Sequence, residues 1–242
     1  LAPVTAPRLG AVSIGEAIRR AGLEPADIQE VIMGCVLPAG LGQGPARQAM
    51  LQAGMPASSG ATTINKLCGS GMKATMFAHD LIKAGSNDLM VAGGMESMTN
   101  TPYLLDKARG GYRMGHGRVL DHMFMDGLED AETGKLMGAF AQEMADEKGI
   151  TREDMDEFAI ASLKRAQQAI AEGWFEDEIV PVTYETRKGE VTVDTDEQPG
   201  ETNLDKVPQL KPAFAKDGTV TAANASSISD GSSALVLARE SV

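Results

Sequence analysis

Cys68 stands where a strand-like run gives way to a helix-like pattern. Residues 61–64 (Ala-Thr-Thr-Ile) favour a buried strand, and residues 69–84 carry apolar side chains at helical spacing. Unpaired N–H groups and the positive end of the helix dipole lower the pKa of a thiol at a helix start. The small residues 69–71 (Gly-Ser-Gly) would let an acyl chain approach the sulfur. The position therefore suggests an acyl-carrying nucleophile, although a lone cysteine can equally be a small buried hydrophobe.

The segment around this cysteine, residues 65–74 (NKLCGSGMKA), resembles the nucleophile segment of the thiolases, enzymes that make or cleave 3-ketoacyl-CoA. Three further stretches resemble the same family in the same order. Residues 88–98 resemble the strand and glycine turn after the nucleophile helix. Segments 112–116 and 135–138 resemble the loop domain that covers the CoA tail, and segments 211–214 and 218–231 resemble the return from that domain to the sheet.

The resemblance implies an α/β fold of the thiolase-like layered type, with one mostly parallel sheet flanked by helices and an inserted loop domain. Residues 1–96 and 216–242 would form the N-terminal thiolase domain without its first strand, and residues 97–215 the CoA-covering loop domain. The Gly-His-Pro and Cys-x-Gly-Gly-Gly motifs that complete a thiolase site do not occur in this sequence. We therefore expect the chain to be a fragment that lacks the C-terminal half.

The resemblance also assigns roles to single residues. Cys68 would be the acyl-accepting nucleophile, and its backbone N–H one donor of an oxyanion hole. Ser226 would hydrogen-bond the pantetheine arm of CoA, and Met137 would line the acyl pocket. Phe214, Ala222 and Leu128 would lie beside the cofactor. Leu136 and residues 199–200 depart from the family pattern, where many biosynthetic thiolases have a CoA-contacting histidine and often an arginine.

The implied reaction is ping-pong acyl transfer: Claisen condensation of two acetyl-CoA molecules to acetoacetyl-CoA, and the reverse thiolysis, through an acyl-cysteine. CoA and acyl-CoA would be substrates, with no covalently bound cofactor and no metal, and the parent enzyme would be a homodimer or homotetramer. Two alternatives stay open. The chain could be an inactive truncated module that retains only folding or dimerisation, or a ketoacyl synthase relative.

The other candidate side chains favour structural roles. His79 lies 11 residues beyond Cys68 on the same expected helix, about 16 Å along its axis, too far to activate the sulfur. His116 and His122 fall in a glycine-rich segment, where a solvated or hydrogen-bonded histidine is expected rather than a base. Cys35 follows a strand-like apolar run and is expected to be a small core residue. The two cysteines match no zinc or CxxC spacing.

Composition limits the possible partners. Lys and Arg total 22 and Asp and Glu 34, a net charge of −12 that argues against a nucleic-acid partner. No apolar run approaches membrane-spanning length, and no disulfide framework is indicated, so we expect a cytoplasmic protein without membrane contact. A concentration of basic residues could hold the CoA phosphates or be ordinary solvated surface. These residues are Lys107, Arg109, Arg113, Arg118 and Lys135.

Periodicity and capping signals predict the remaining elements. Helices are expected at 12–21, ended by Gly22, at 45–53, and from an N-cap at Thr151 to Gly173. Strands are expected at 31–37, 88–92, 219–222 and 233–238, and a hairpin at 179–184 and 190–193. The polar stretch 194–207 is expected to be a surface connection.

Overall fold

The structure is a computed structural model that describes residues 1–242 and divides into two compact units. The sheet unit comprises Leu1–Gly127, Val182–Val191 and Ser229–Val242. The helical unit comprises Leu128–Pro181 and Thr192–Ile228. Residues 97–127 thus belong to the same compact unit as the sheet. The predicted division into an N-terminal thiolase domain and a loop domain concerns the architecture of the family and stays a prediction.

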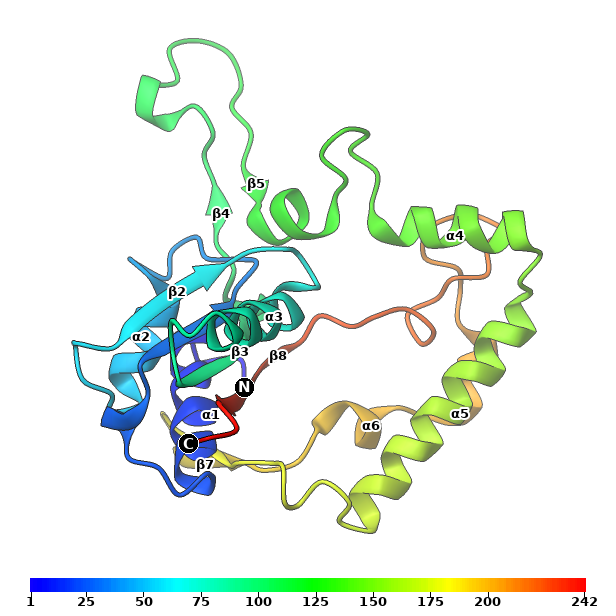
Figure 1. Cartoon of the computed structure of the whole chain (residues 1–242). Helices are drawn as coiled ribbons and strands as arrows, with labels where there is room; N and C mark the ends of the chain where they lie inside the picture. Colours follow the sequence, from blue (N-terminus) through cyan, green and yellow to red (C-terminus); the bar gives the residue numbers. More distant parts are fainter. The chain divides into compact units, whose positions relative to one another are not determined.

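A four-stranded sheet in the order β2-β1-β3-β8 forms the centre of the sheet unit (Figure 1). Strand β1 (Glu30–Gly34) runs parallel to both β2 (Gly60–Ile64) and β3 (Leu89–Ser97). Strand β8 (Asp230–Ala238) pairs antiparallel with β3. The sheet is therefore mostly parallel, which confirms the predicted fold class.

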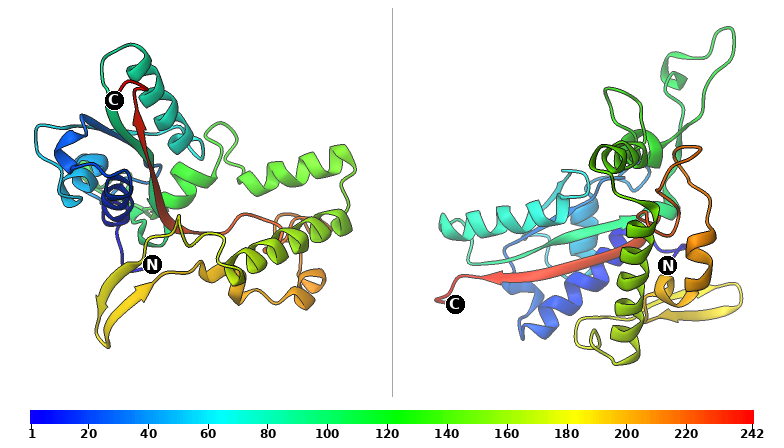
Figure 2. Two further views of the ribbon diagram at one scale, coloured as in Figure 1. Left: turned by 60° about the horizontal axis from the view of Figure 1, so that its bottom comes forward. Right: turned by 90° about the vertical axis from the view of Figure 1, so that its right-hand side faces the viewer.

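Helices cover both faces of this sheet. Helices α1 (Ala6–Arg20) and α2 (Pro45–Gln52) pack on one face, and α3 (Ser70–Lys83) packs on the other. The right-hand view of Figure 2 shows α3 and α1 on opposite sides of β3 and β8. The alternation of side chains along a strand explains this arrangement, because successive residues of β1 must enter different cores.

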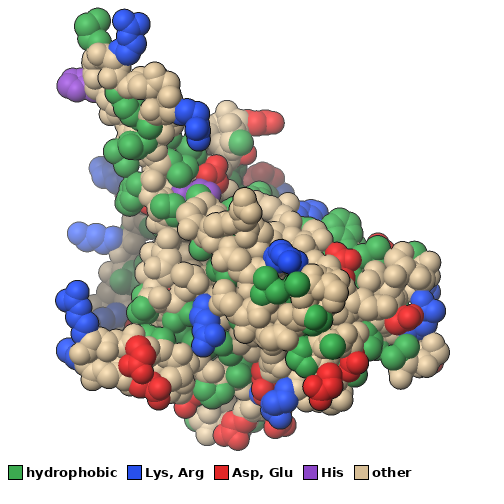
Figure 3. Space-filling view, turned by 90° about the vertical axis from the view of Figure 1, so that its left-hand side faces the viewer, with side chains coloured by type: hydrophobic (Ala, Val, Ile, Leu, Met, Phe, Trp, Pro, Cys, Tyr) green, Lys and Arg blue, Asp and Glu red, His purple; other side chains and the backbone are tan.

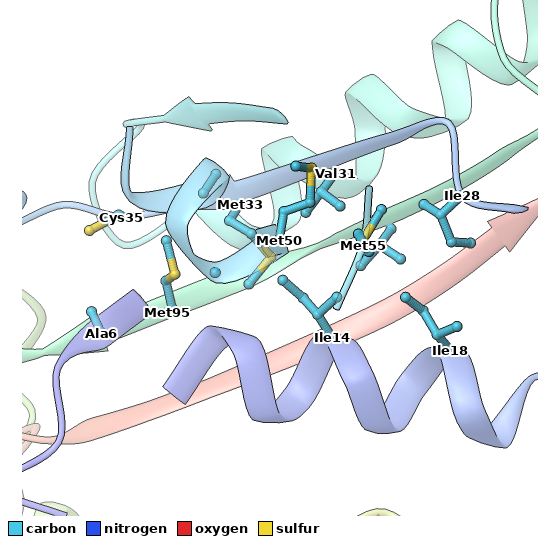
Figure 4. Packing of buried hydrophobic residues seen from close by; sticks show 13 residues of the cluster. Ala6, Ile14, Ile18, Ile28, Val31, Met33, Cys35, Met50, Met55 and Met95 are labelled. Atoms are coloured by element: carbon cyan, nitrogen blue, oxygen red, sulfur yellow. The ribbon is translucent and has the colours of Figure 1, made fainter. Parts of the chain in front are cut away.

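The two cores follow that alternation. Val31 and Met33 of β1 lie in a buried cluster with Ile14 of α1 and Met50 of α2 (Figure 4). Between them, Ile32 points to the opposite face and joins a second cluster. That cluster is completed by Ala74, Ala78, Met90 and Ala92. The alanines let α3 lie close to the strands.

Most elements of the sheet unit were predicted within a few residues, and the differences have local causes. The first helix begins at Ala6 rather than residue 12, because proline in its first turn is compatible with a helix start. Gly22 follows its end with φ +70°, as predicted for a glycine that stops a helix. The strand predicted at 31–37 ends at Gly34, because the Glu96 carboxylate accepts the N–H groups of Val36 and Leu37.

Shorter elements complete the sheet unit. The two-residue strands β4 (Tyr103–Leu104) and β5 (Leu120–Asp121) pair with each other. Residues 105–119 between them form a segment that projects from the sheet unit (Figure 1), called the projecting segment below. Strands β6 (Val182–Thr186) and β7 (Gly189–Val193) form the predicted hairpin, shifted by a few residues. Single 3₁₀ turns lie at Pro25–Asp27, Met98–Asn100 and Ala108–Gly110, and a short π-helix, Phe124–Leu128, ends at the first residue of the helical unit.

The helical unit contains α4 (Met137–Lys148) and α5 (Arg152–Ala171). As predicted, Thr151 caps α5: its side chain accepts the Asp154 N–H while the Asp154 side chain accepts the Thr151 N–H. None of the helices combines the length and the apolar composition that a membrane-crossing helix requires.

Two predictions for this unit were wrong. The stretch 194–207 is not merely a connection, since it holds α6 (Glu197–Glu201) and part of a 3₁₀ helix, η5 (Leu204–Gln209). The side chains of Asp196 and Asn203 accept first-turn N–H groups and so begin these helices. Residues 219–222 form no strand, because side chains rather than a neighbouring strand bind their backbone N–H groups.

The capping contact of α5 gives a stability prediction. Replacing Thr151 by alanine should lower the free energy of unfolding by about 1 kcal/mol, because the Asp154 N–H loses its acceptor. Urea denaturation followed by circular dichroism would measure the change. Exposed Glu157 in the same helix is the control, and Glu157→Ala should stay within about 0.5 kcal/mol of the parent. Equal effects of the two substitutions would contradict the capping role.

Candidate functional site

Cys68 lies between β2 and α3, where the sequence predicted the change from strand to helix. Its side chain is exposed. Gly69 is the N-cap of α3 and offers no side-chain cap, so no capping side chain covers the N–H groups at the helix start, of which the Ser70 N–H donates to the Leu67 carbonyl at 3.0 Å. An accessible thiol beside such N–H groups is the arrangement that a nucleophile needs.

The turn before Cys68 has an unusual backbone. Leu67 has φ +47° and is the one non-glycine residue of the chain with a positive φ. Asn65 Oδ1 accepts the Leu67 N–H at 2.8 Å, and the Ser70 hydroxyl donates to the Leu67 carbonyl at 2.5 Å. The same hydroxyl oxygen accepts the Lys66 N–H at 2.8 Å. Two side chains thus hold the turn that presents Cys68.

The first turn of α3 lies directly against the end of β1. A Cβ atom added at Gly34 would lie 2.6 Å from the Ser70 Cβ and 2.8 Å from the Gly71 backbone nitrogen. No side chain fits in that space. The glycine therefore fixes how closely the helix, and with it Cys68, approaches the end of the sheet.

Cys35 has the opposite environment. It is 1% exposed and belongs to the larger core cluster, which confirms that it is a small core residue. Its thiol donates to Glu96 Oε1 at 3.6 Å. Burial, followed by the negative charge of Glu96, raises the pKa of Cys35 to about 12. Its thiolate is therefore scarce at neutral pH.

The histidines do not supply a base to Cys68. His122 is buried, with Nδ1 2.6 Å from Asp126 Oδ2 and Nε2 accepting the Ala39 N–H at 3.3 Å. An accepting Nε2 carries no proton, so the proton is on Nδ1 and faces Asp126. His79 is exposed beside Asp80, and His116 is exposed. His122 is thus a hydrogen-bonded structural residue, as the sequence analysis expected.

The five predicted CoA-contacting residues all lie in the helical unit, whereas Cys68 lies in the sheet unit. Met137 is the first residue of α4, and Ser226 and Ala222 are exposed. The Phe214 ring covers Gly138, next to Met137: a Cβ there would lie 2.1 Å from the ring. Leu128 is half-buried at the start of the unit. Their roles stay predictions.

A buried glutamine holds part of the segment before Ser226. Gln142 of α4 is 4% exposed, and its Oε1 accepts the N–H groups of Thr219 at 2.8 Å and Val220 at 3.1 Å. Its Nε2 donates to Asp146 at 2.8 Å. The amide is therefore used on both sides and fixes this segment on α4.

A second network holds the following residues. Asn224 Oδ1 accepts the Thr221 N–H at 2.7 Å, and its Nδ2 donates to Asp156 Oδ1 at 3.1 Å. Asp156 of α5 is buried and accepts from Arg152 Nε at 2.7 Å. Sequence reasoning missed Gln142 and Asp156, because neither position carries a local signal. Asn224 lies within segment 218–231, which resembles the thiolase family, but no role was predicted for it.

The basic residues divide between the two units. Lys107, Arg109, Arg113 and Arg118 are exposed on the projecting segment of the sheet unit, whereas Lys135 belongs to the helical unit and pairs with Glu143 at 2.6 Å. Figure 3 shows basic and hydrophobic side chains together on that segment. Its most exposed apolar residue is Met114, at 98%. No cluster of His, Cys, Asp and Glu could hold a metal ion.

The chain belongs to the thiolase family, because residues 1–241 match the family described as the thiolase N-terminal domain. It is 51% identical over 240 residues to the acetyl-CoA acetyltransferase of Cupriavidus necator, covering 98% of this chain and 61% of that relative. It is 49% identical over 243 residues to the acetyl-CoA acetyltransferase of Escherichia coli, covering 100% of this chain and 62% of that one. The resemblance drawn from the sequence is thereby confirmed, and the thiolase interpretation is favoured over the ketoacyl synthase alternative.

Solved structures agree with this assignment. The crystal structure of Acat5 thiolase from Ascaris suum in complex with coenzyme A matches with a TM-score of 0.92 and 41% identity, covering 100% of this chain and 62% of that one. The acetyl-CoA acetyltransferase from Syntrophomonas wolfei matches with a TM-score of 0.95 and 42% identity, covering 100% and 61%. This chain therefore spans about three fifths of the length of these relatives.

The contrast between the two cysteines predicts selective alkylation. Near neutral pH, iodoacetamide should label Cys68 at least about tenfold faster than Cys35. Cys35 reacts slowly for two reasons: its thiolate is scarce at this pH, and its side chain is buried, whereas Cys68 is exposed. Peptide mass spectrometry of the folded protein would measure both rates. In denaturant the difference should vanish, which serves as the control. Equal labelling in the folded protein would contradict the burial of Cys35 and the exposure of Cys68.

The Asp156–Asn224 contact predicts coupling between two substitutions. Asn224→Asp should lower the free energy of unfolding by about 2 kcal/mol or more, because it sets a second carboxylate against buried Asp156. Adding Asp156→Asn should recover part of this loss, since the amide and the carboxylate then exchange places. Urea denaturation of both single variants and the double variant tests the coupling. Strictly additive effects would contradict it.

Proposed function

We propose that this chain carries the acyl-accepting cysteine of an acetyl-CoA C-acetyltransferase, which joins two acetyl-CoA molecules into acetoacetyl-CoA and catalyses the reverse thiolysis. The observation that carries the proposal is the exposed Cys68 thiol at the start of α3, within the segment that resembles the thiolase nucleophile segment. Two relatives named acetyl-CoA acetyltransferase, 51% and 49% identical to this chain, support the substrate class.

The chemistry would proceed in two half-reactions. The Cys68 thiolate attacks the thioester carbonyl of acetyl-CoA, a sulfur–carbon bond forms, and CoA leaves as a thiol after taking up a proton. A second acetyl-CoA loses a proton from its methyl carbon and attacks the acetyl-cysteine. Carbon–carbon bond formation then releases the Cys68 thiolate and acetoacetyl-CoA. In the reverse direction, free CoA takes the acyl group from Cys68.

The residues of this chain would contribute binding and charge stabilisation. The Cys68 N–H would donate to the oxyanion that develops on the attacked carbonyl. Ser226 would hydrogen-bond the pantetheine arm, with Phe214, Ala222 and Leu128 beside the cofactor and Met137 along the acyl group. Exposed basic residues of the projecting segment could offset the net charge of −12 near the CoA phosphates.

The proton transfers set the expected rate. The hydrogen bonds of His79 and His122 go to Asp80, Asp126 and Ala39 and not to Cys68, so no histidine of this chain is bonded to the thiol as a proton relay. We therefore expect slow acylation of Cys68 without sustained turnover by this chain alone. The same observation favours the second candidate, a folding or dimerisation module. A cytoplasmic location and a dimeric or tetrameric parent enzyme remain part of the proposal.

The decisive experiment is acetylation of the purified chain by acetyl-CoA, followed by intact-protein and peptide mass spectrometry. One acetyl group should appear on Cys68, with release of one equivalent of CoA. Cys35→Ala should be acetylated like the parent, whereas Cys68→Ser, which lacks the thiol, should gain no thioester-linked acetyl group. Absence of acetylation at saturating acetyl-CoA would refute the enzymatic proposal in favour of the module. Sustained cleavage of acetoacetyl-CoA would refute the module.

A further inference from the structure

The peptide group between Leu67 and Cys68 is held from its carbonyl side. The Leu67 carbonyl accepts both the Ser70 hydroxyl at 2.5 Å and the Ser70 N–H at 3.0 Å. A peptide unit is planar, so its carbonyl and the following N–H point in fixed opposite directions. Whatever orients the Leu67 carbonyl therefore also aims the Cys68 N–H.

The left-handed backbone at Leu67 needs support. A side chain with a Cβ is disfavoured at φ +47°, because the Cβ crowds the following carbonyl oxygen. Asn65 provides the support from the amino side, since its Oδ1 accepts the Leu67 N–H at 2.8 Å. Ser70 provides it from the carboxyl side. Both peptide groups that flank Leu67 are thus bound by side chains.

Asn65 also connects this turn to the sheet. Its Nδ2 donates to the Val36 carbonyl at 3.3 Å, and the Val36 N–H donates to the Glu96 carboxylate at 2.7 Å. Glu96 belongs to β3. A continuous line of hydrogen bonds therefore runs from β3 through the segment after β1 to the residue that precedes Cys68.

From this geometry we propose that Asn65 and Ser70 are positioning residues that keep Leu67 left-handed and so aim the Cys68 N–H at the oxyanion formed during acyl transfer. The inference rests on the proposed function, because it names the residues that orient the oxyanion donor of the same site. Neither side chain needs to touch the substrate. Their effect passes through the Leu67–Cys68 peptide group.

Two reactions of the same thiol separate positioning from general damage. Acetylation by acetyl-CoA passes through an oxyanion, whereas alkylation by iodoacetamide displaces iodide and forms none. Asn65→Ala and Ser70→Ala should each slow acetylation of Cys68 by about tenfold or more while changing the alkylation rate by less than about threefold. Both rates would be measured by mass spectrometry on the full chain, at a temperature where thermal melts show each variant folded.

Conservative and compensating variants sharpen the test. Asn65→Asp keeps an oxygen for the Leu67 N–H but turns an acceptor toward the Val36 carbonyl, so it should acetylate faster than Asn65→Ala and more slowly than the parent. Leu67→Gly in the Asn65→Ala background should restore most of the lost rate, because glycine adopts a positive φ without support. Thr75→Ala, which removes a hydroxyl bond to the Gly71 carbonyl one turn along α3, is the matched control and should change neither rate.

The outcomes distinguish the inference from the function on which it rests. If the parent chain is acetylated and Asn65→Ala and Ser70→Ala are acetylated equally fast, the positioning role is wrong. It is also wrong if acetylation and alkylation fall in parallel, or if Leu67→Gly restores nothing. If the parent itself is not acetylated while iodoacetamide still labels Cys68, the proposed function fails and takes the positioning role with it.

Discussion

Close packing between the end of β1 and the first turn of α3 determines the local structure around Cys68. Gly34 permits the contact, because a Cβ at that position would lie 2.6 Å from the Ser70 Cβ. Ser70 also binds the backbone at Lys66 and Leu67, so helix packing and the shape of the turn depend on the same residue. The thiol is consequently held at the end of the sheet, on the solvent side of a tightly packed junction.

Local sequence signals were sufficient for this junction and insufficient for its neighbours. A β-branched run followed by helical spacing predicted the change at Cys68, since both signals lie within twenty residues of it. The end of β1 was missed because Glu96, a distant residue, binds the N–H groups that would have extended the strand. The strand expected at 219–222 was likewise replaced by contacts from Gln142 and Asn224. Bonds from side chain to backbone leave no periodic trace, whether they come from distant Gln142 or from Asn224, three residues along the chain.

The candidate site shows the same division. The place of Cys68 at a helix start could be predicted because it is a local property, whereas its role as a nucleophile came from the resemblance to thiolases and stays a proposal. Asn65 lies in the same motif, but its role depends on the Val36 carbonyl, which the sequence cannot place. Asp156 is buried and charged, and only its contacts with Arg152 and Asn224 explain why it is tolerated there. The sequence could thus indicate a candidate reactive residue, whereas the groups that orient this residue could be found only from the folded structure.

The position of β8 has a consequence for how the chain folds. Leu89 of β3 pairs with Ala238 of β8, so along the sequence the whole helical unit is inserted between two strands that are neighbours in one sheet. During synthesis, the β3 edge that β8 covers stays unpaired until residues 230–238 have left the ribosome. Such late pairing over a long sequence separation slows folding and leaves the nascent chain open to association with other chains.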